Sequence, residues 1–397
     1  MRRYRMSRRF VIKRDSFLLF FYLFLLIKPQ YFTSMNEYMP LAFAGMQLFV
    51  LLIIALKKKI HLDSFMVGVI VFFLYQFINN TIQGGTKSYI TTIISGLYAC
   101  LIVQHLYYDY MGNQLFFFAY RVFTILLGIN LLMGTLGLNL TVLYHNREED
   151  IFFLGRYNQI TCYIIVAILL LYLCYSSGKI KTFEFITSAT IILLNKLYVP
   201  SATLTICIII MLLSFVLTKL PRRIVKLITP LNVSILLVVL FYILTISFNF
   251  GFMAKIFERL GKDVTLSQRT EIWKIVYVTL ASFKNLVFGL GEKSGGAYIT
   301  IWTGNTFSAH NLFLQLMLEG GIILLGIYLY MYFCTLRNVR KINDNNQRAR
   351  ICLIVLVYFI SCMTEVFPIY MNLVFLYFLY LFCIDQKSMK KTGYIMR

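Results

Sequence analysis

The sequence predicts an all-α, polytopic integral membrane protein with roughly twelve transmembrane helices. Of its 397 residues, 59% are hydrophobic and only 14% are charged, and the mean hydropathy is +0.75. Long apolar runs recur from one end of the chain to the other, which is more apolar surface than one soluble core can bury. Runs of about 17 to 25 apolar residues are typical of membrane-spanning helices, because the hydrocarbon core is about 30 Å thick and a helix rises about 1.5 Å per residue.

We expect these spans to follow one another through a single membrane domain that covers residues 1–397. Most connections between them are short, and the first and last spans are themselves short. The predicted spans lie near residues 16–27, 40–56, 64–79, 89–108, 116–138, 158–176, 183–198, 202–218, 228–250, 311–333, 351–367 and 371–384.

The formal net charge of +22 is divided among six basic clusters. With a cytoplasmic N-terminus and roughly twelve spans, every cluster falls on the cytoplasmic side, as the positive-inside rule expects. Both termini are therefore expected in the cytoplasm. Acidic lipid headgroups would attract this face, and no nucleic-acid partner is needed to explain the charge. The clusters are residues 1–14, 57–59, 178–181, 219–226, 337–350 and 387–391.

Neither the N-terminus nor the cysteines point to a secreted protein. The first basic cluster and the apolar run after it also have the pattern of a signal peptide. No small-residue cleavage site follows Ile27, so an uncleaved first helix is favoured. All eight cysteines lie inside apolar runs, without the spacing of a disulfide framework or a metal site.

One connection is much longer than the others and covers residues 251–309. The charge pattern places it outside the cytoplasm, and a loop of this length is usually functional or disordered. Its stretch SQRTEIWKIVYVTLASFKNLVFGLG (267–291) predicts an amphipathic helix at the membrane surface, with Ser267 as N-cap, Glu271 in the first turn and Gly289 to Gly291 ending it. Its apolar residues at helical spacing are Ile272, Ile275, Val276, Leu280 and Phe283.

The stretch SAHNLFLQLMLEGG (308–321) carries polar residues into the next apolar run. Asn311, Gln315 and Glu319 are four residues apart, so they form one stripe on a helix that has to face protein or water. Hydrogen bonding between helices explains such a stripe as well as a functional site does. His310 lies at the outer mouth of this helix, where an imidazole can act as a base, although a structural role is the commoner one for a single interfacial histidine.

Taken in order, these motifs resemble those of the O-antigen polymerase and O-antigen ligase superfamily, the Wzy/WaaL-like membrane glycosyltransferases. The R-x-x-x-W element is matched by Arg269 and Trp273, and the G-x-G segment by Gly289 to Gly291. The H-N-x-x-L element begins at His310, and the E-x-G element at Glu319. The resemblance covers residues 267–326 strongly and the remaining chain only in helix count and topology.

The resemblance implies a GT-C-like helical fold in the bacterial cytoplasmic membrane. It implies transfer of a glycan from a polyprenyl-pyrophosphate carrier to a hydroxyl on the outer face, with neither a metal nor another cofactor. Arg269 would bind the pyrophosphate leaving group, and His310 would orient or deprotonate the acceptor. The residues expected to support this site are Asn311, Gln315, Glu319, Trp273 and Glu271.

A second pyrophosphate-binding arginine of the family is matched by Arg156, in LGRYNQIT before the sixth span. The chain departs from the family at VPSATL (199–204), where alanine stands in place of an arginine. With that arginine absent, neutralisation of the pyrophosphate charge would fall to Arg156, Arg269 and Lys196. An interfacial anchor that reaches lipid headgroups is the alternative role for each arginine.

Among the reactions of this superfamily we favour polymerisation of capsular, O-antigen or exopolysaccharide repeat units. Its partners would be a lipid-linked oligosaccharide, membrane lipid, and flippase and chain-length regulator proteins. The alternatives are O-antigen ligase-type transfer to another acceptor, a lipid-linked oligosaccharide flippase or transporter, and a structural scaffold. The sequence has no outer D-x-D pair, no phosphate-binding P-loop and no H-E-x-x-H motif. Sugar recognition is expected from loop residues such as Tyr298, Trp302, Asn305 and Thr306.

Overall fold

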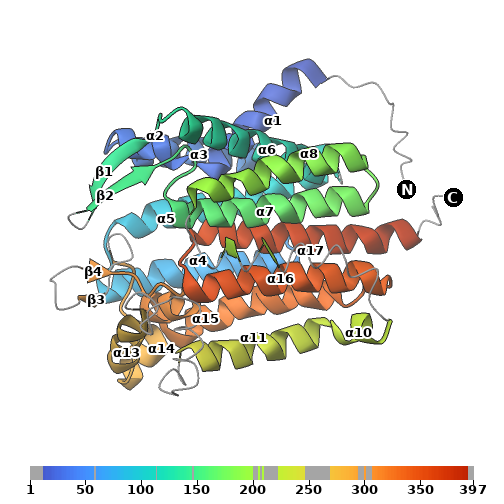
Figure 1. Cartoon of the computed structure of the whole chain (residues 1–397). Coiled ribbons are helices and arrows are strands. Elements are labelled where there is room, and N and C mark those ends of the chain that lie inside the picture. The colour runs from blue at the N-terminus through green and yellow to red at the C-terminus, as the bar shows by residue number, and fades with distance from the viewer. Residues whose placement is uncertain are drawn as a thin grey trace.

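The apolar runs form helices that lie side by side in one bundle (Figure 1). This arrangement comes from a computed structural model. The residues that it describes are 12–57, 60–112, 114–144, 147–199, 204–205, 208–209, 222–245, 269–293, 299–300 and 306–391. The predicted span 202–218 lies largely outside these residues, as do Ser267, Tyr298, Trp302 and Asn305.

Among the described residues, seven helices are long and apolar enough to cross a membrane, which confirms a helical polytopic membrane protein. They are α3 (Met39–Lys57), α4 (Ser64–Gln83), α5 (Ser88–His105) with the π-helical turn η1 (Leu106–Met111), α6 (Gln114–Thr135), α7 (Tyr157–Ser176), α15 (Leu312–Val339) and α16 (Asn345–Thr364). Shorter apolar segments lie in α1 (Ile12–Ile27), α11 (Pro230–Thr245) and α17 (Ile369–Lys391). The total of twelve spans and the GT-C-like fold remain predictions.

Helix α17 lies in the interior of the bundle and contacts α5, α15 and α7. Residues 373–379 have no exposed surface at all. A helix that is hydrophobic on every side can face lipid or be buried in protein, and the complete burial of these residues places α17 among other helices. The predicted span 183–198, in contrast, forms the 13-residue helix α8 (Thr182–Leu194) followed by the 3₁₀ turn η2 (Asn195–Tyr198).

The short elements gather at one end of the bundle, called the hairpin end here (Figure 1). In the described ranges, two antiparallel hairpins join β1 (Leu140–Tyr144) to β2 (Arg147–Ile151), and β3 (Ile299–Thr300) to β4 (Thr306–Phe307). The helices α2 (Gln30–Met35), α13 (Arg269–Thr279) and α14 (Phe283–Phe288) also lie there. The basic helix α10 (Arg222–Leu227) and the last residues of α17 lie at the opposite end.

The prediction of one amphipathic helix over residues 267–291 is wrong, because the chain turns between α13 and α14. The hydroxyl of Ser282 accepts a hydrogen bond from the backbone N–H of Asn285 and caps α14. Phe283, expected on the apolar face, is therefore 78% exposed. The buried face of α13, which includes Ile272 and Val276, packs against α15.

Helix α15 covers its predicted span but is broken at Gly321, where φ is 67° and ψ is −166°. A break in a helix leaves backbone carbonyls without their usual N–H donors, and these carbonyls need new hydrogen-bond donors. The N–H of Leu290 donates to the carbonyl of Leu318 at 2.7 Å, and the N–H of Gly291 donates to that of Glu319 at 3.1 Å. The G-x-G segment therefore closes the break in α15.

Candidate functional site

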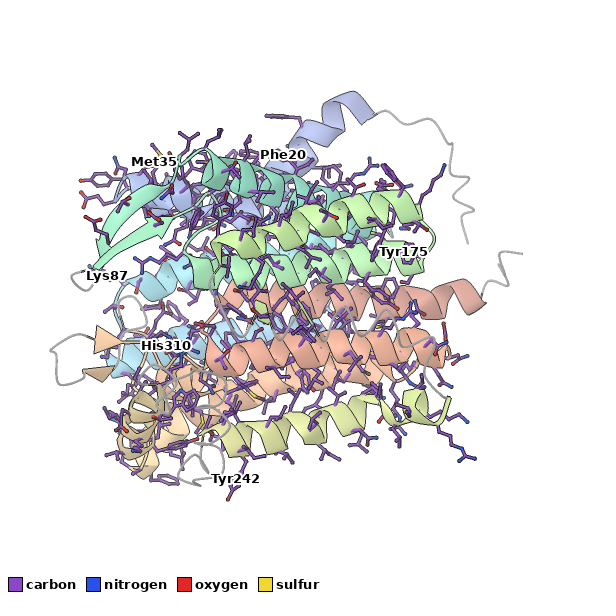
Figure 2. All side chains as sticks on the ribbon, viewed as in Figure 1. Phe20, Met35, Lys87, Tyr175, Tyr242 and His310 are labelled. Atoms are coloured by element: carbon purple, nitrogen blue, oxygen red, sulfur yellow. The ribbon has the colours of Figure 1, made fainter. Side chains whose placement is uncertain are left out.

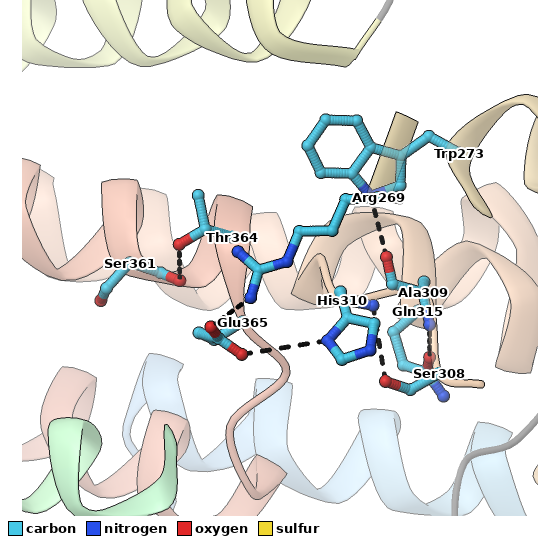
Figure 3. Close-up of polar contacts among 9 residues, drawn as sticks. All are labelled: Arg269, Trp273, Ser308, Ala309, His310, Gln315, Ser361, Thr364 and Glu365. Atoms are coloured by element: carbon cyan, nitrogen blue, oxygen red, sulfur yellow. Dashed lines mark hydrogen bonds and ion pairs between the residues drawn. The ribbon is translucent and has the colours of Figure 1, made fainter. Parts of the chain in front are cut away.

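Arg269, His310 and Glu365 come together at the hairpin end (Figure 3). The Arg269 Nη2 atom lies 2.6 Å from Glu365 Oε1, and His310 Nδ1 lies 4.0 Å from Glu365 Oε2. The Glu365 side chain is 5% exposed, whereas those of Arg269 and His310 are 20% and 28% exposed. One buried carboxylate thus pairs with a guanidinium and faces an imidazole, and both the guanidinium and the imidazole remain partly accessible.

The position of Arg269 follows from the packing of α13. Arg269 is the first residue of that helix, and Trp273 follows one turn later. The indole N–H of Trp273 donates to the carbonyl of Ala309 at 2.8 Å, and the ring is 1% exposed. This bond fixes the start of α13 beside the residue that precedes His310, so the R-x-x-x-W and H-N elements meet in space.

His310 has an unusual backbone conformation, with φ of 46°. A positive φ is costly for a residue with a side chain, and such strain is often found at functional sites. The residues on both sides are fixed: the N–H of Ala309 donates to Gln315 Oε1 at 3.0 Å, and Asn311 caps α15. The surrounding bonds therefore hold the imidazole in place at the entrance of α15.

Asn311 is completely buried, and its side-chain amide carries one hydrogen-bond acceptor and one donor group. Its Oδ1 atom accepts from the N–H groups of Phe313 and Leu314 at 3.0 and 3.2 Å. Within the described part of the chain, its Nδ2 atom has no hydrogen-bond partner. Because unpaired buried donors are costly, this amide beside His310 is a candidate for contact with a substrate hydroxyl or water.

The predicted polar stripe continues down α15 as a hydrogen-bonded pair. The Nε2 atom of Gln315 donates to Glu319 Oε1 at 2.8 Å. The carbonyl of Glu319 also accepts from the side chain of Asn79 on α4 at 3.0 Å. These two residues connect the site to the break in α15 and to α4, and the supporting role expected of them stays a prediction.

Beside the break, Glu292 enters the bundle from the loop after α14. Its Oε1 atom accepts from Thr92 at 2.9 Å, and its Oε2 atom accepts from Gln76 Nε2 at 3.1 Å. Burial raises the pKa of the Glu292 carboxyl, and the Thr92 hydrogen bond offsets part of this effect. Among the described residues, the buried Oε1 atom of Gln76 has no donor.

Glu292→Gln is expected to stabilise the protein at neutral and higher pH. A raised folded-state pKa gives stability that is complete below the unfolded pKa and is lost as the pH rises through the folded value. The new amide removes this loss and offers a donor to Gln76 Oε1. Thermal unfolding in detergent should show a higher transition temperature than wild type at pH 8 and little difference near pH 4.5. Glu37→Gln, at an exposed carboxyl, is the control, and equal transitions for wild type and Glu292→Gln at pH 8 would contradict the prediction.

The other predicted residues lie apart from this group. Glu271 is 53% exposed and pairs with Lys274 at 2.8 Å, so the structure does not bring it to Glu365. Lys196 donates to the carbonyl of Val199 at 2.6 Å. Arg156 precedes α7 as its N-cap, and its backbone N–H donates to Gln30 Oε1 at 3.2 Å.

Glu365 is not among the site residues that the sequence predicts. It is the last residue before the α16–α17 turn, and its N–H donates to the carbonyl of Ser361 at 2.9 Å. The available signal was a single acidic residue at the end of an apolar run, in TEVFP (364–368). Ionisable residues next to spans are functional candidates, but the sequence alone does not show what faces them.

The described residues contain no group of three or more His, Cys, Asp and Glu side chains that could hold a metal ion. None of the seven cysteines in this described part of the chain forms a disulfide: Cys100, Cys162, Cys174, Cys334, Cys352, Cys362 and Cys383. Chemically, the site offers a base in His310, a carboxylate in Glu365 and a cation in Arg269. That set suits proton removal from a hydroxyl next to a departing anionic group.

Comparison with known proteins gives one match. The family model described as O-antigen ligase matches residues 162–329, from α7 into α15. The matched segment contains Arg269, Trp273 and His310, whereas Arg156 and Glu365 lie outside it. No curated protein and no solved structure matches the chain.

Proposed function

The chain belongs to the O-antigen polymerase and ligase superfamily through residues 162–329, and we propose that it polymerises lipid-linked polysaccharide repeat units. Membrane-spanning helices and the family together indicate the bacterial inner membrane and a lipid-linked oligosaccharide substrate. The observation that carries the proposal is the meeting of two motif residues, Arg269 and His310, on the carboxylate of Glu365. In this reading the hairpin end faces outward, since the basic helix α10 lies at the opposite end (Figure 1).

The proposed reaction is a single displacement at the anomeric carbon of the donor glycan. A hydroxyl of the acceptor repeat unit forms the new bond to this carbon, while the bond from the carbon to the phosphate oxygen breaks. The hydroxyl proton passes to His310 Nε2, and the electron pair leaves with the polyprenyl pyrophosphate. Arg269 has further guanidinium N–H donors besides the one on Glu365, and these would bind the leaving pyrophosphate.

Glu365 would orient His310 through Nδ1, so that Nε2 faces the acceptor. It would also stabilise the imidazolium that forms when the proton arrives, which is the role of the carboxylate in a catalytic triad. The 4.0 Å separation is longer than a hydrogen bond, and catalytic contacts are commonly long before substrate binds. Because Arg269 supplies the positive charge at the leaving group, the scheme needs no metal ion.

Surface polysaccharide from a deletion strain tests the proposal. The strain is complemented with wild type, His310→Ala, Arg269→Ala or the control Lys274→Ala, and membrane levels are checked by blotting. We expect single lipid-linked repeat units to accumulate with His310→Ala and with Arg269→Ala, and normal polymer with Lys274→Ala. Finished polymer accumulating on the carrier would assign the protein as a ligase. Normal surface polymer from His310→Ala and Arg269→Ala would contradict an enzymatic role for this site and favour a flippase or scaffold.

A further inference from the structure

Lys28 has a strained backbone conformation of the same kind as His310. Among the described non-glycine residues, these two alone have positive φ values, 51° for Lys28 and 46° for His310. Lys28 lies between α1 and α2 in the chain, and α2 is one of the elements at the hairpin end (Figure 1). Strain of this kind persists only where the surrounding structure imposes it.

Three helices impose this conformation on Lys28. Its N–H donates to the carbonyl of Phe24 in α1 at 2.9 Å. The carbonyl of the preceding Ile27 accepts from the hydroxyls of Tyr163 on α7 and Tyr370 on α17, at 3.0 and 3.3 Å. Tyr370 lies in the first turn of α17, and Glu365 ends the preceding helix α16, so only a short connection separates Glu365 from a residue that fixes the backbone beside Lys28.

Within the part of the chain that the structure describes, the ammonium group of Lys28 has no compensating partner. Burial lowers its pKa, and within the described residues its side chain makes neither a hydrogen bond nor an ion pair. A partly buried cation without a partner is costly. Two residues later, Gln30 accepts from the backbone N–H of Arg156, so a second basic residue begins its helix close to the same junction.

We propose that Lys28 binds a phosphate group of the lipid-linked substrate, on the α1–α2 side of the site and near Arg156. The inference rests on the proposed function, because it assigns this phosphate to a polyprenyl pyrophosphate. Anionic phospholipid headgroups offer the same phosphate chemistry at the membrane surface, so the experiment has to separate the two sources. A lysine ammonium suits either, since it acts as a point charge with three donors.

Binding of farnesyl pyrophosphate to the purified full chain in phosphatidylcholine nanodiscs tests the proposal. Lys28→Met is expected to raise the Kd at least about tenfold, which corresponds to the loss of one charge-assisted hydrogen bond. Lys28→Arg should recover part of the affinity. Lys87→Met removes the same charge from an exposed lysine at the hairpin end (Figure 2) and should leave the Kd unchanged.

A second variant guards against misfolding. Lys28→Gly removes the ammonium while favouring the positive φ, so it should fold at least as well as wild type and bind as weakly as Lys28→Met. Wild-type affinity in Lys28→Gly would overturn the inference and leave the proposed function intact. Failure of wild type itself to bind farnesyl pyrophosphate would instead count against the proposed function. Binding of phosphatidylglycerol headgroups is measured in nanodiscs that contain this lipid. If Lys28→Met weakens that binding as much as it weakens binding of farnesyl pyrophosphate, Lys28 binds headgroups and the pyrophosphate assignment is overturned.

Discussion

Arg269→Ala is expected to lower the rate of glycan transfer at least about 100-fold, the usual effect of removing one group that stabilises developing charge. The guanidinium is the cation that the structure holds next to His310, through Glu365. The measurement is polymerisation of lipid-linked repeat units by membranes that contain equal amounts of each variant. Lys274→Ala, on the exposed side of the same helix, should leave the rate unchanged, because its pair with Glu271 is exposed at both ends and such pairs contribute little.

The same substitution should also destabilise the protein, for a separate reason. It leaves the Glu365 carboxylate buried without its partner, which costs about 3–5 kcal/mol at a fully buried site. The cost here should be smaller, because the Arg269 side chain is 20% exposed. The double variant Arg269→Ala, Glu365→Gln removes the unpaired charge, so it should regain much of the stability and remain inactive.

This pair of measurements separates a catalytic role from a structural one. If the ion pair only holds α13 on the turn after α16, activity should return together with stability in the double variant. If Arg269 and Glu365 act in the reaction, only stability should return. Normal activity in Arg269→Ala at normal membrane level would exclude the arginine from the reaction altogether.

The sequence located the residues of the site that lie in local motifs. Arg269 and Trp273 are one helical turn apart, and His310 opens an apolar run, so they form the local motifs on which the resemblance to the superfamily rests. Glu365 and Lys28 have no such pattern around them. Their importance depends on how α16 and α1 pack against distant helices, and hydropathy carries no information about that packing.

Hydropathy located the seven membrane-length helices of the described residues but did not register changes in backbone direction. Leu280 and Phe283 fit one helical period, yet the chain turns between them because the Ser282 hydroxyl starts a new helix. The break at Gly321 was missed for the same reason, because the apolar pattern continues through it. A glycine pair after Glu319 was the signal, and only the observed φ and ψ angles show its consequence.

Gly321→Ala is therefore expected to destabilise the protein by at least about 2 kcal/mol. The φ and ψ angles of Gly321 lie in a region that is essentially restricted to glycine. An added Cβ would also meet backbone atoms, 2.1 Å from the carbonyl oxygen of Val287 and 2.5 Å from the nitrogen of Phe288. This backbone has little room to move, because the hydrogen bonds of Leu290 and Gly291 clamp the same segment to α15.

Gly326→Ala is the matched control, since Gly326 lies in the same helix and an added Cβ would meet nothing within 4 Å. Alanine there should leave stability unchanged or raise it by up to about 1 kcal/mol, because alanine favours the helix more than glycine does. Heating detergent-solubilised protein, followed by size-exclusion chromatography, compares the two variants. A transition temperature for Gly321→Ala as high as that for Gly326→Ala would show that the chain can do without the break. Because the helical turns before the break carry Gln315 and support His310, Gly321→Ala should also reduce transfer at temperatures where the protein remains folded.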